Sequence, residues 1–118
     1  MWDNPLAQMA ASWAKKARAF SHGGEATSAQ AIGMSGLGDT TQGLIGMLGR
    51  MYTEKAAANA NGQSPIYQGC GGSCSINAFA HEWGHFCLLL DACAQRLGAA
   101  ITVPRWDANS LFGVINVS

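Results

Sequence analysis

Residues 76–98 read INAFAHEWGHFCLLLDACAQRLG and hold the most informative pattern in the 118-residue chain. Apolar side chains recur there at helical spacing on one side, namely Phe79, Trp83, Phe86, Leu90, Cys93 and Leu97. Ser73 or Ser75 can cap the start of such a helix, and Gly98 can end it. The pattern therefore predicts a helix over about 76–97 with a broad buried face.

Two histidines and a glutamate within this helix form an H-E-x-x-H motif, His81-Glu82-Trp83-Gly84-His85. On a helix, His81 and His85 lie about 40° apart, so both imidazoles can bind one metal ion. Glu82 lies about 60° from His85, beside the metal, where it can take a proton from metal-bound water and pass it to a leaving amine. The motif predicts His81 and His85 as zinc ligands and Glu82 as the general base.

Other interpretations of the same residues remain open. Two helix histidines beside an ordinary glutamate need no metal at all. A purely structural zinc site, with one or more cysteines joining the histidines, would be closed and inactive. Of the four cysteines, Cys70 and Cys74 have the spacing of half a metal site, whereas Cys87 and Cys93 lie about 120° apart on the predicted helix and are expected to be small buried hydrophobes.

The segment from about Gly69 to Gly98 resembles the active-site helix of the zincin metallopeptidases. Within that group, the HEWGH sequence after a glycine-rich loop is similar to the zincin-like domains of large polyvalent proteins of phages and mobile elements. The resemblance implies zinc as cofactor, a peptide or protein as substrate, and hydrolysis of a peptide bond by zinc-activated water. It also implies a substrate-binding strand near the helix, for which residues 65–68 are the candidate.

The third zinc ligand is where the sequence departs from the family. Only two carboxylates follow His85, and neither is in an ideal place. Asp91 has the metzincin offset, but Leu88 replaces the glycine that breaks the helix there, so Asp91 would point about 120° away from His85. Asp107 lies 22 residues after His85, which is similar to the spacing in some gluzincins. Asp107 is therefore the tentative third ligand; a turn aspartate at this position and a ligand from a longer parent protein are the alternatives.

The remaining pattern predicts a mostly helical α+β fold, a zincin-like core with short flanking strands. Residues 1–62 form its helical N-terminal part and residues 63–118 its metal-binding strand-helix-strand part, within one domain or fragment. The expected elements are a helix from about Pro5 that His22-Gly23-Gly24 stops, a loop over 23–38, a second helix capped by Asp39 or Thr40, a linker over 56–64, and strands at 65–68, 99–103 and 111–117.

Within the second helix, Leu44, Ile45, Leu48, Met51 and Tyr52 are expected to share one side. Gly43, Gly46 and Gly49 recur three residues apart in the same segment. They indicate either a close contact face for another helix or simply a weak helix, since each glycine costs up to about 1 kcal/mol. His22 and Glu25, in the preceding glycine-rich segment, are expected to be ordinary loop residues.

The amino-acid composition limits the kinds of partner that the chain is expected to bind. Seven basic and seven acidic residues give a formal net charge of zero, which argues against non-specific binding to nucleic acid. No stretch has the length of a membrane span, and the N-terminus lacks a signal-peptide pattern, so a cytoplasmic protein is expected. Charged residues make up only 12% of the chain, which indicates a surface that meets a parent protein or an oligomer. The alternative to a peptidase is a non-catalytic zincin-like fragment serving as an interaction or structural module.

Overall fold

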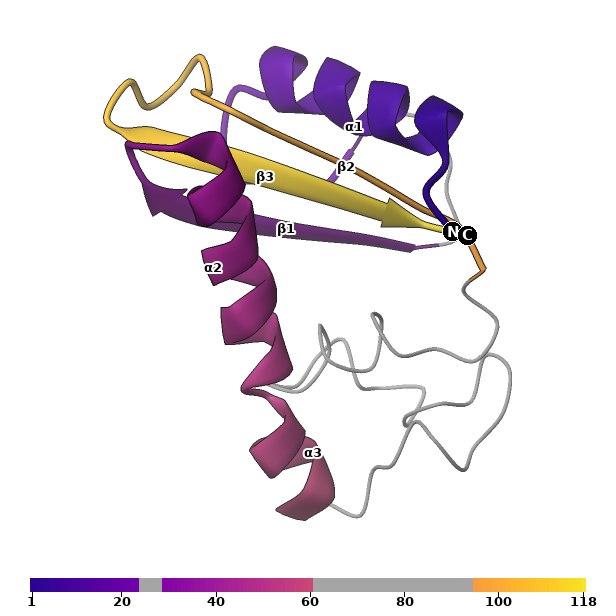
Figure 1. Ribbon diagram of the computed structural model, residues 1–118. Helices are drawn as coiled ribbons and strands as arrows, with labels where there is room; N and C mark the ends of the chain where they lie inside the picture. The colour runs from indigo at the N-terminus through magenta and orange to yellow at the C-terminus, as the bar shows by residue number, and fades with distance from the viewer. Residues whose placement is uncertain (24–28, 61–94) are drawn as a thin grey trace.

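The computed structural model describes residues 1–23, 29–60 and 95–118. Along these ranges the elements are α1 (Asn4–Lys16), β1 (Ala29–Gly36), α2 (Thr40–Tyr52), α3 (Lys55–Ala60), β2 (Leu97–Thr102) and β3 (Ser110–Val117). The three strands form one antiparallel sheet in the order β1–β3–β2 (Figure 1). The expectation of a mostly helical fold is wrong: the described part of the chain is α+β, built around this sheet.

The central strand β3 joins the two ends of the sequence. It pairs with β1 from Ala29 opposite Val117 to Gly36 opposite Ser110, and with β2 on its other side. The loop expected over 23–38 is therefore wrong for residues 29–36. Glycine, serine and alanine give β1 little intrinsic strand preference, and it is the pairing with the buried β3 that makes this segment a strand.

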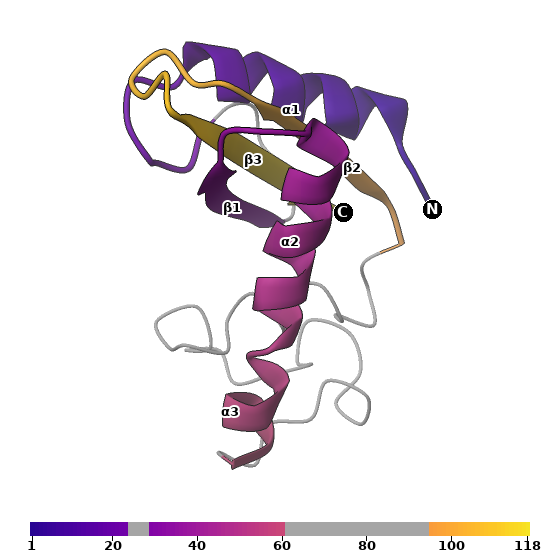
Figure 2. The same ribbon diagram turned by 60° about the vertical axis from the view of Figure 1, so that its left-hand side comes forward.

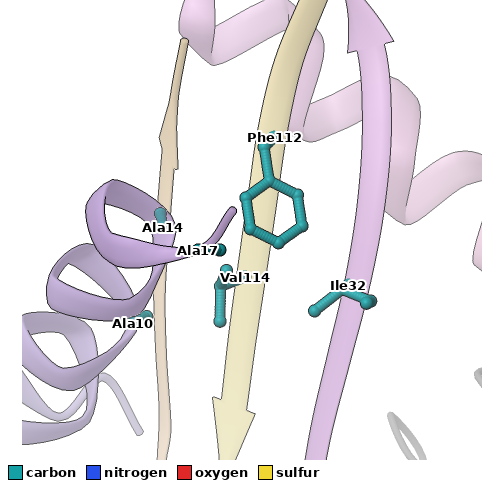
Figure 3. Packing of buried hydrophobic residues seen from close by; sticks show 6 residues of the cluster. All are labelled: Ala10, Ala14, Ala17, Ile32, Phe112 and Val114. Carbon is teal, nitrogen blue, oxygen red and sulfur yellow. The ribbon is translucent and has the colours of Figure 1, made fainter. Parts of the chain in front are cut away.

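Alternation along the strands divides the sheet into two buried faces. On one face, Phe112 and Val114 of β3 and Ile32 of β1 pack against Ala10, Ala14 and Ala17, as Figure 3 shows. These alanines recur at helical spacing in and directly after α1, and their small side chains let the helix lie close to the sheet. Asp3 caps this helix, since its Oδ1 accepts a hydrogen bond from Leu6 N at 2.9 Å.

The opposite face of the sheet is covered by α2 (Figure 2). Of the two caps that the sequence offered, Asp39 and Thr40, the structure has Asp39, whose Oδ1 accepts a hydrogen bond from Gln42 N at 2.9 Å. The predicted contact side of this helix is only partly correct. Gly43, Met47 and Met51 are buried, whereas Ile45 and Tyr52 are each 55% exposed.

The glycines of α2 differ in their surroundings. A Cβ on Gly43 would lie 2.9 Å from Leu111 Cδ1 and 3.2 Å from Ile101 Cδ1, so this glycine permits a close approach of the helix to the sheet. A Cβ on Gly49 would meet nothing within 4 Å. The close contact that the spacing indicated therefore exists at Gly43, but its partner is a sheet and not another helix.

The predicted helix over 76–97 has the wrong C-terminal end. Residues 95 and 96 are not helical, and Leu97 and Gly98 lie in β2. Gly98 is buried beneath the first turn of α1, where a Cβ would lie 2.5 Å from the Leu6 carbonyl carbon and 2.7 Å from Asp3 O. This glycine is needed for a helix–sheet crossing, whereas the sequence pattern indicated a helix C-cap.

The remaining predictions have mixed outcomes. The two helices near residues 5–20 and 40–52 and the strands near 99–103 and 111–117 are confirmed, with α1 ending at Lys16 and β2 at Thr102. The linker expected over 56–64 is wrong for its first part, because α3 continues to Ala60. The expected strand at 65–68 lies outside the described residues. Over residues 1–23, 29–60 and 95–118, no helix is both long and apolar enough to cross a membrane.

Candidate metal centre

The three motif residues His81, Glu82 and His85 lie outside the described residues, as do Asp91, Glu25 and all four cysteines. Asp107 and His22 are the candidates that the structure places. Within residues 1–23, 29–60 and 95–118, no three His, Cys, Asp or Glu side chains come together in a group that could hold a metal ion.

Gln95, the first described residue after the motif, lies beside both ends of the chain. The Met1 ammonium donates a hydrogen bond to Gln95 O at 3.0 Å, and Gln95 N donates to Ser118 O at 2.9 Å. Arg96 and Ser118 exchange a further pair of backbone hydrogen bonds. These contacts hold Gln95 and Arg96 beside the two ends of the chain.

Asp107 lies at the opposite end of β2 from Gln95, in the loop that joins β2 to β3. Its Oδ1 accepts a hydrogen bond from Asn109 N at 2.9 Å, so the carboxylate holds a turn in the way that aspartate commonly does. The side chain is half-buried, which leaves part of the carboxylate accessible. The turn role that the sequence left open is thus observed, and a metal role would have to be compatible with it.

Aromatic packing holds the Asp107 loop on the sheet. The Trp106 ring contacts the Phe112 ring edge-on, with 5.8 Å between the ring centroids. The Phe20 ring also contacts the Phe112 ring edge-on, with 6.0 Å between the centroids. Pro104 in the same loop is buried. Trp106 Nε1 is a buried donor that has no hydrogen-bond partner among the described residues. The loop is therefore anchored by Pro104 and Trp106, which precede Asp107.

His22 belongs to a polar network that joins the segment after α1 to the sheet. Its Nδ1 lies 3.1 Å from Gln30 Oε1, which also accepts a hydrogen bond from Gly23 N at 3.1 Å. Gln30 Nε2 donates to Gly23 O at 2.8 Å and to Asn116 Oδ1 at 2.9 Å. His22 is exposed and serves this connection, which agrees with the expectation of an ordinary loop residue.

A hollow of about 200 Å³ between β1 and α2 was not anticipated from the sequence. It is lined by Ile32, Gly33 and Met34 of β1 and by Met47, Arg50 and Met51 of α2. Arg50 Nη2 donates a 2.6 Å hydrogen bond to the Met34 carbonyl oxygen on β1. In the sequence, the one feature that could have pointed to this hollow is Arg50, the single charged residue of α2.

Comparison with known proteins adds no family. The chain matches no protein-family model, and no curated protein matches it significantly.

Proposed function

We propose that this protein is a zinc-dependent metallopeptidase that hydrolyses peptide bonds, with His81 and His85 as zinc ligands and Glu82 as general base. One observation carries the proposal, the HEWGH sequence at residues 81–85 within a segment of helical pattern. Imidazole nitrogens four residues apart on a helix are a donor set that suits zinc. When bound, zinc lowers the pKa of a coordinated water to about 7 and polarises the scissile carbonyl.

Glu82 has the chemistry for the remaining step. A carboxylate beside the metal accepts the proton of the attacking water and then donates it to the departing amine, so one side chain acts first as base and then as acid. Because the carboxylate is not a ligand in this scheme, removing its charge should stop proton transfer without removing the metal.

Asp107 is the proposed third ligand, and the length of β2 bears on that role. From Leu97 to Thr102 the strand spans about 17 Å, at roughly 3.3 Å per residue. Gln95 lies ten positions after His85, a separation that would span about 15 Å in a helix. The third-ligand role of Asp107 therefore requires His85 to lie near the Asp107 end of β2.

The alternative function is a non-catalytic zincin-like module that binds a partner or a parent protein. The hydrogen bond from Asn109 N to Asp107 Oδ1 favours it, because that bond gives Asp107 a structural role that needs no metal. Under this alternative the protein retains its fold and lacks peptidase activity.

The test combines zinc content and activity. The purified wild type should hold about one zinc per chain, His85→Ala should lose it, and Glu82→Gln should keep zinc while losing peptidase activity on a protein substrate such as casein. A wild type without stoichiometric zinc contradicts the proposal. Zinc binding with no activity in the wild type favours the non-catalytic module.

A further inference from the structure

One end of the sheet brings three separate segments of the chain together. β1 and β2 each pair antiparallel with β3, so they run in the same direction and both end opposite the first residues of β3. Leu37 follows β1 there, and Val103 follows β2. α1 ends on the same side, because Ala17, directly after the helix, packs in one buried cluster with Phe112. Figures 1 and 2 both show the C-terminal end of α1, the loop after β2 and the start of α2 beside one another.

Two ring contacts join the segment after α1 to the loop after β2. The Phe20 and Trp106 rings each contact the Phe112 ring edge-on, with centroid distances of 6.0 Å and 5.8 Å. Arg18 and Arg105 lie within two residues of these rings, so both arginines belong to this end of the sheet. This surface is called the basic end, and it comprises residues 15–20, 37 and 103–106.

The formal net charge of zero conceals an uneven distribution of the basic residues. Four of the seven lie at the basic end and are exposed, namely Lys15, Lys16, Arg18 and Arg105. The other three each contact a neighbouring group, namely Arg50, Lys55 and Arg96. The two lysines also suit the C-terminal end of α1, where the helix dipole favours cations. The two arginines lie outside the helices, so the dipole does not account for them.

Two carboxylates border the basic end, and the backbone uses both of them. Asp39 Oδ1 accepts the hydrogen bond that caps α2, and Asp107 Oδ1 accepts the bond from Asn109 N in its turn. The basic end and its border thus hold four cations against two carboxylates. Such a surface attracts a partner of negative charge.

The same end exposes three large apolar side chains, one from each of the three segments. Leu37 is 59% exposed, Phe20 is 53% exposed and Val103 is 45% exposed. Exposed apolar side chains beside lysine and arginine are typical of surfaces that enter the interface of an anionic bilayer. Single-stranded nucleic acid binds instead on several aromatic faces, and two of these three side chains are aliphatic.

We propose that the basic end docks on the surface of an anionic lipid bilayer. Leu37, Phe20 and Val103 enter the boundary between headgroups and acyl chains, and the four cations contact the phosphate and carboxylate groups of the lipids. A flat bilayer suits this surface, because its apolar side chains come from three segments that end side by side. The proposal is independent of the zinc site, since it uses residues of the sheet end alone.

The first test measures binding of the full 118-residue chain to vesicles of stated composition. Co-sedimentation should show binding to vesicles that contain about 30% phosphatidylserine in phosphatidylcholine, and binding at least about tenfold weaker to pure phosphatidylcholine. Raising the salt concentration from about 0.1 M to about 0.5 M should weaken the binding, because salt screens exposed charges. A wild type that does not bind the anionic vesicles overturns the proposal.

A matched pair of lysine substitutions tests the position of the charges. Lys16→Gln should weaken binding to the anionic vesicles by about fivefold, since each cation near such a surface contributes a factor of this size. Lys55→Gln removes an exposed helix lysine from α3, distant from the basic end in Figures 1 and 2, and should bind as the wild type does. Arg18→Gln combined with Arg105→Gln should weaken binding by more than about tenfold. Equal losses in Lys16→Gln and Lys55→Gln overturn the proposal.

A second matched pair tests the apolar side chains. Leu37→Ser should weaken vesicle binding by about fivefold, whereas Ile45→Ser, which removes a similarly exposed aliphatic side chain outside the basic end, should weaken it by less than about twofold. Circular dichroism should show that all the variants remain folded. Tighter binding to a single-stranded oligothymidine than to the anionic vesicles, at the same salt concentration, overturns the proposal in favour of a nucleic-acid surface.

Discussion

Asn116 Nδ2, on the central strand, donates a 3.2 Å hydrogen bond to Leu6 O in the first turn of α1, 110 residues earlier in the chain. The bond passes over Gly98, which is the residue opposite Asn116 on β2. Because Gly98 has no side chain, the helix backbone lies close enough for the amide of the neighbouring strand to reach it. The missing Cβ and the buried amide together fix where α1 crosses the sheet.

Gly98→Ala is expected to destabilise the protein by about 2 kcal/mol or more, since the new Cβ would overlap the helix backbone and the backbone cannot move aside without shifting α1. Chemical denaturation measures the change in the free energy of unfolding. Gly36→Ala, near the exposed end of β1, is the matched control, because a Cβ there meets nothing within 4 Å. It should change stability by less than about 1 kcal/mol. Equal losses of stability in Gly98→Ala and Gly36→Ala would contradict the close approach of the α1 backbone to Gly98.

Asn116→Ala is expected to cost about 1–3 kcal/mol, because Asn116 is 1% exposed and its amide serves both Leu6 O and Gln30 Nε2. A double-mutant cycle with Gln30→Ala isolates the bond between the two amides. Urea unfolding of the four proteins should give a coupling free energy of about 0.5–1.5 kcal/mol. Strict additivity would show that the two side chains do not stabilise one another.

Met47 fills the space left by a cross-strand pair of glycines. A Cβ on Gly33 would lie 2.8 Å from Met47 Cε, and one on Gly113 would lie 2.5 Å from Met47 Sδ. Gly113→Ala should therefore destabilise the wild type by about 1–3 kcal/mol. The same substitution should cost less when combined with Met47→Val, whose shorter side chain leaves room for the new methyl group. Thermal or urea unfolding of the single and double variants measures these changes in stability. If Gly113→Ala costs as much in the Met47→Val variant as in the wild type, Met47 does not fill the space beside Gly113.

The sequence was sufficient for the elements whose signals are local. Asp3 and Asp39 are caps that lie beside their own helices, and the apolar run of β3 makes a buried strand from its own composition. The sequence was insufficient where distant residues decide. β1 is a strand because β3 lies beside it, and Gly98 is a strand residue because α1 crosses it. No pattern within residues 29–36 or near residue 98 records those neighbours.

The candidate site divides in the same way. The roles of His81, Glu82 and His85 follow from spacing within five residues, and they remain predictions. The third ligand depends on how distant segments meet, which sequence spacing cannot give. For Asp107 the structure shows a hydrogen bond from Asn109 N to Oδ1. This bond belongs to the turn that the local sequence Trp106–Asn109 had indicated.

Asp107 can be tested for its two roles separately, because asparagine retains one and loses the other. In Asp107→Asn, the side-chain oxygen still accepts the hydrogen bond from Asn109 N, but the anionic ligand is gone. If Asp107 is the third ligand, Asp107→Asn should lower zinc affinity by about tenfold or more, while the free energy of unfolding of the metal-free protein stays within about 0.5 kcal/mol of wild type.

Asp107→Ala removes both roles, so it should lower zinc affinity to a similar extent and also cost about 0.5–1.5 kcal/mol of stability in the metal-free protein. Competition with a zinc chelator gives the affinity, and urea unfolding in EDTA gives the stability. Asp91→Asn is the control, since a continuous helix directs that carboxylate away from the metal, and its zinc affinity should equal that of the wild type. Unchanged affinity in both Asp107 variants would leave Asp107 as a turn residue only, and a loss in Asp91→Asn would assign the third ligand to Asp91.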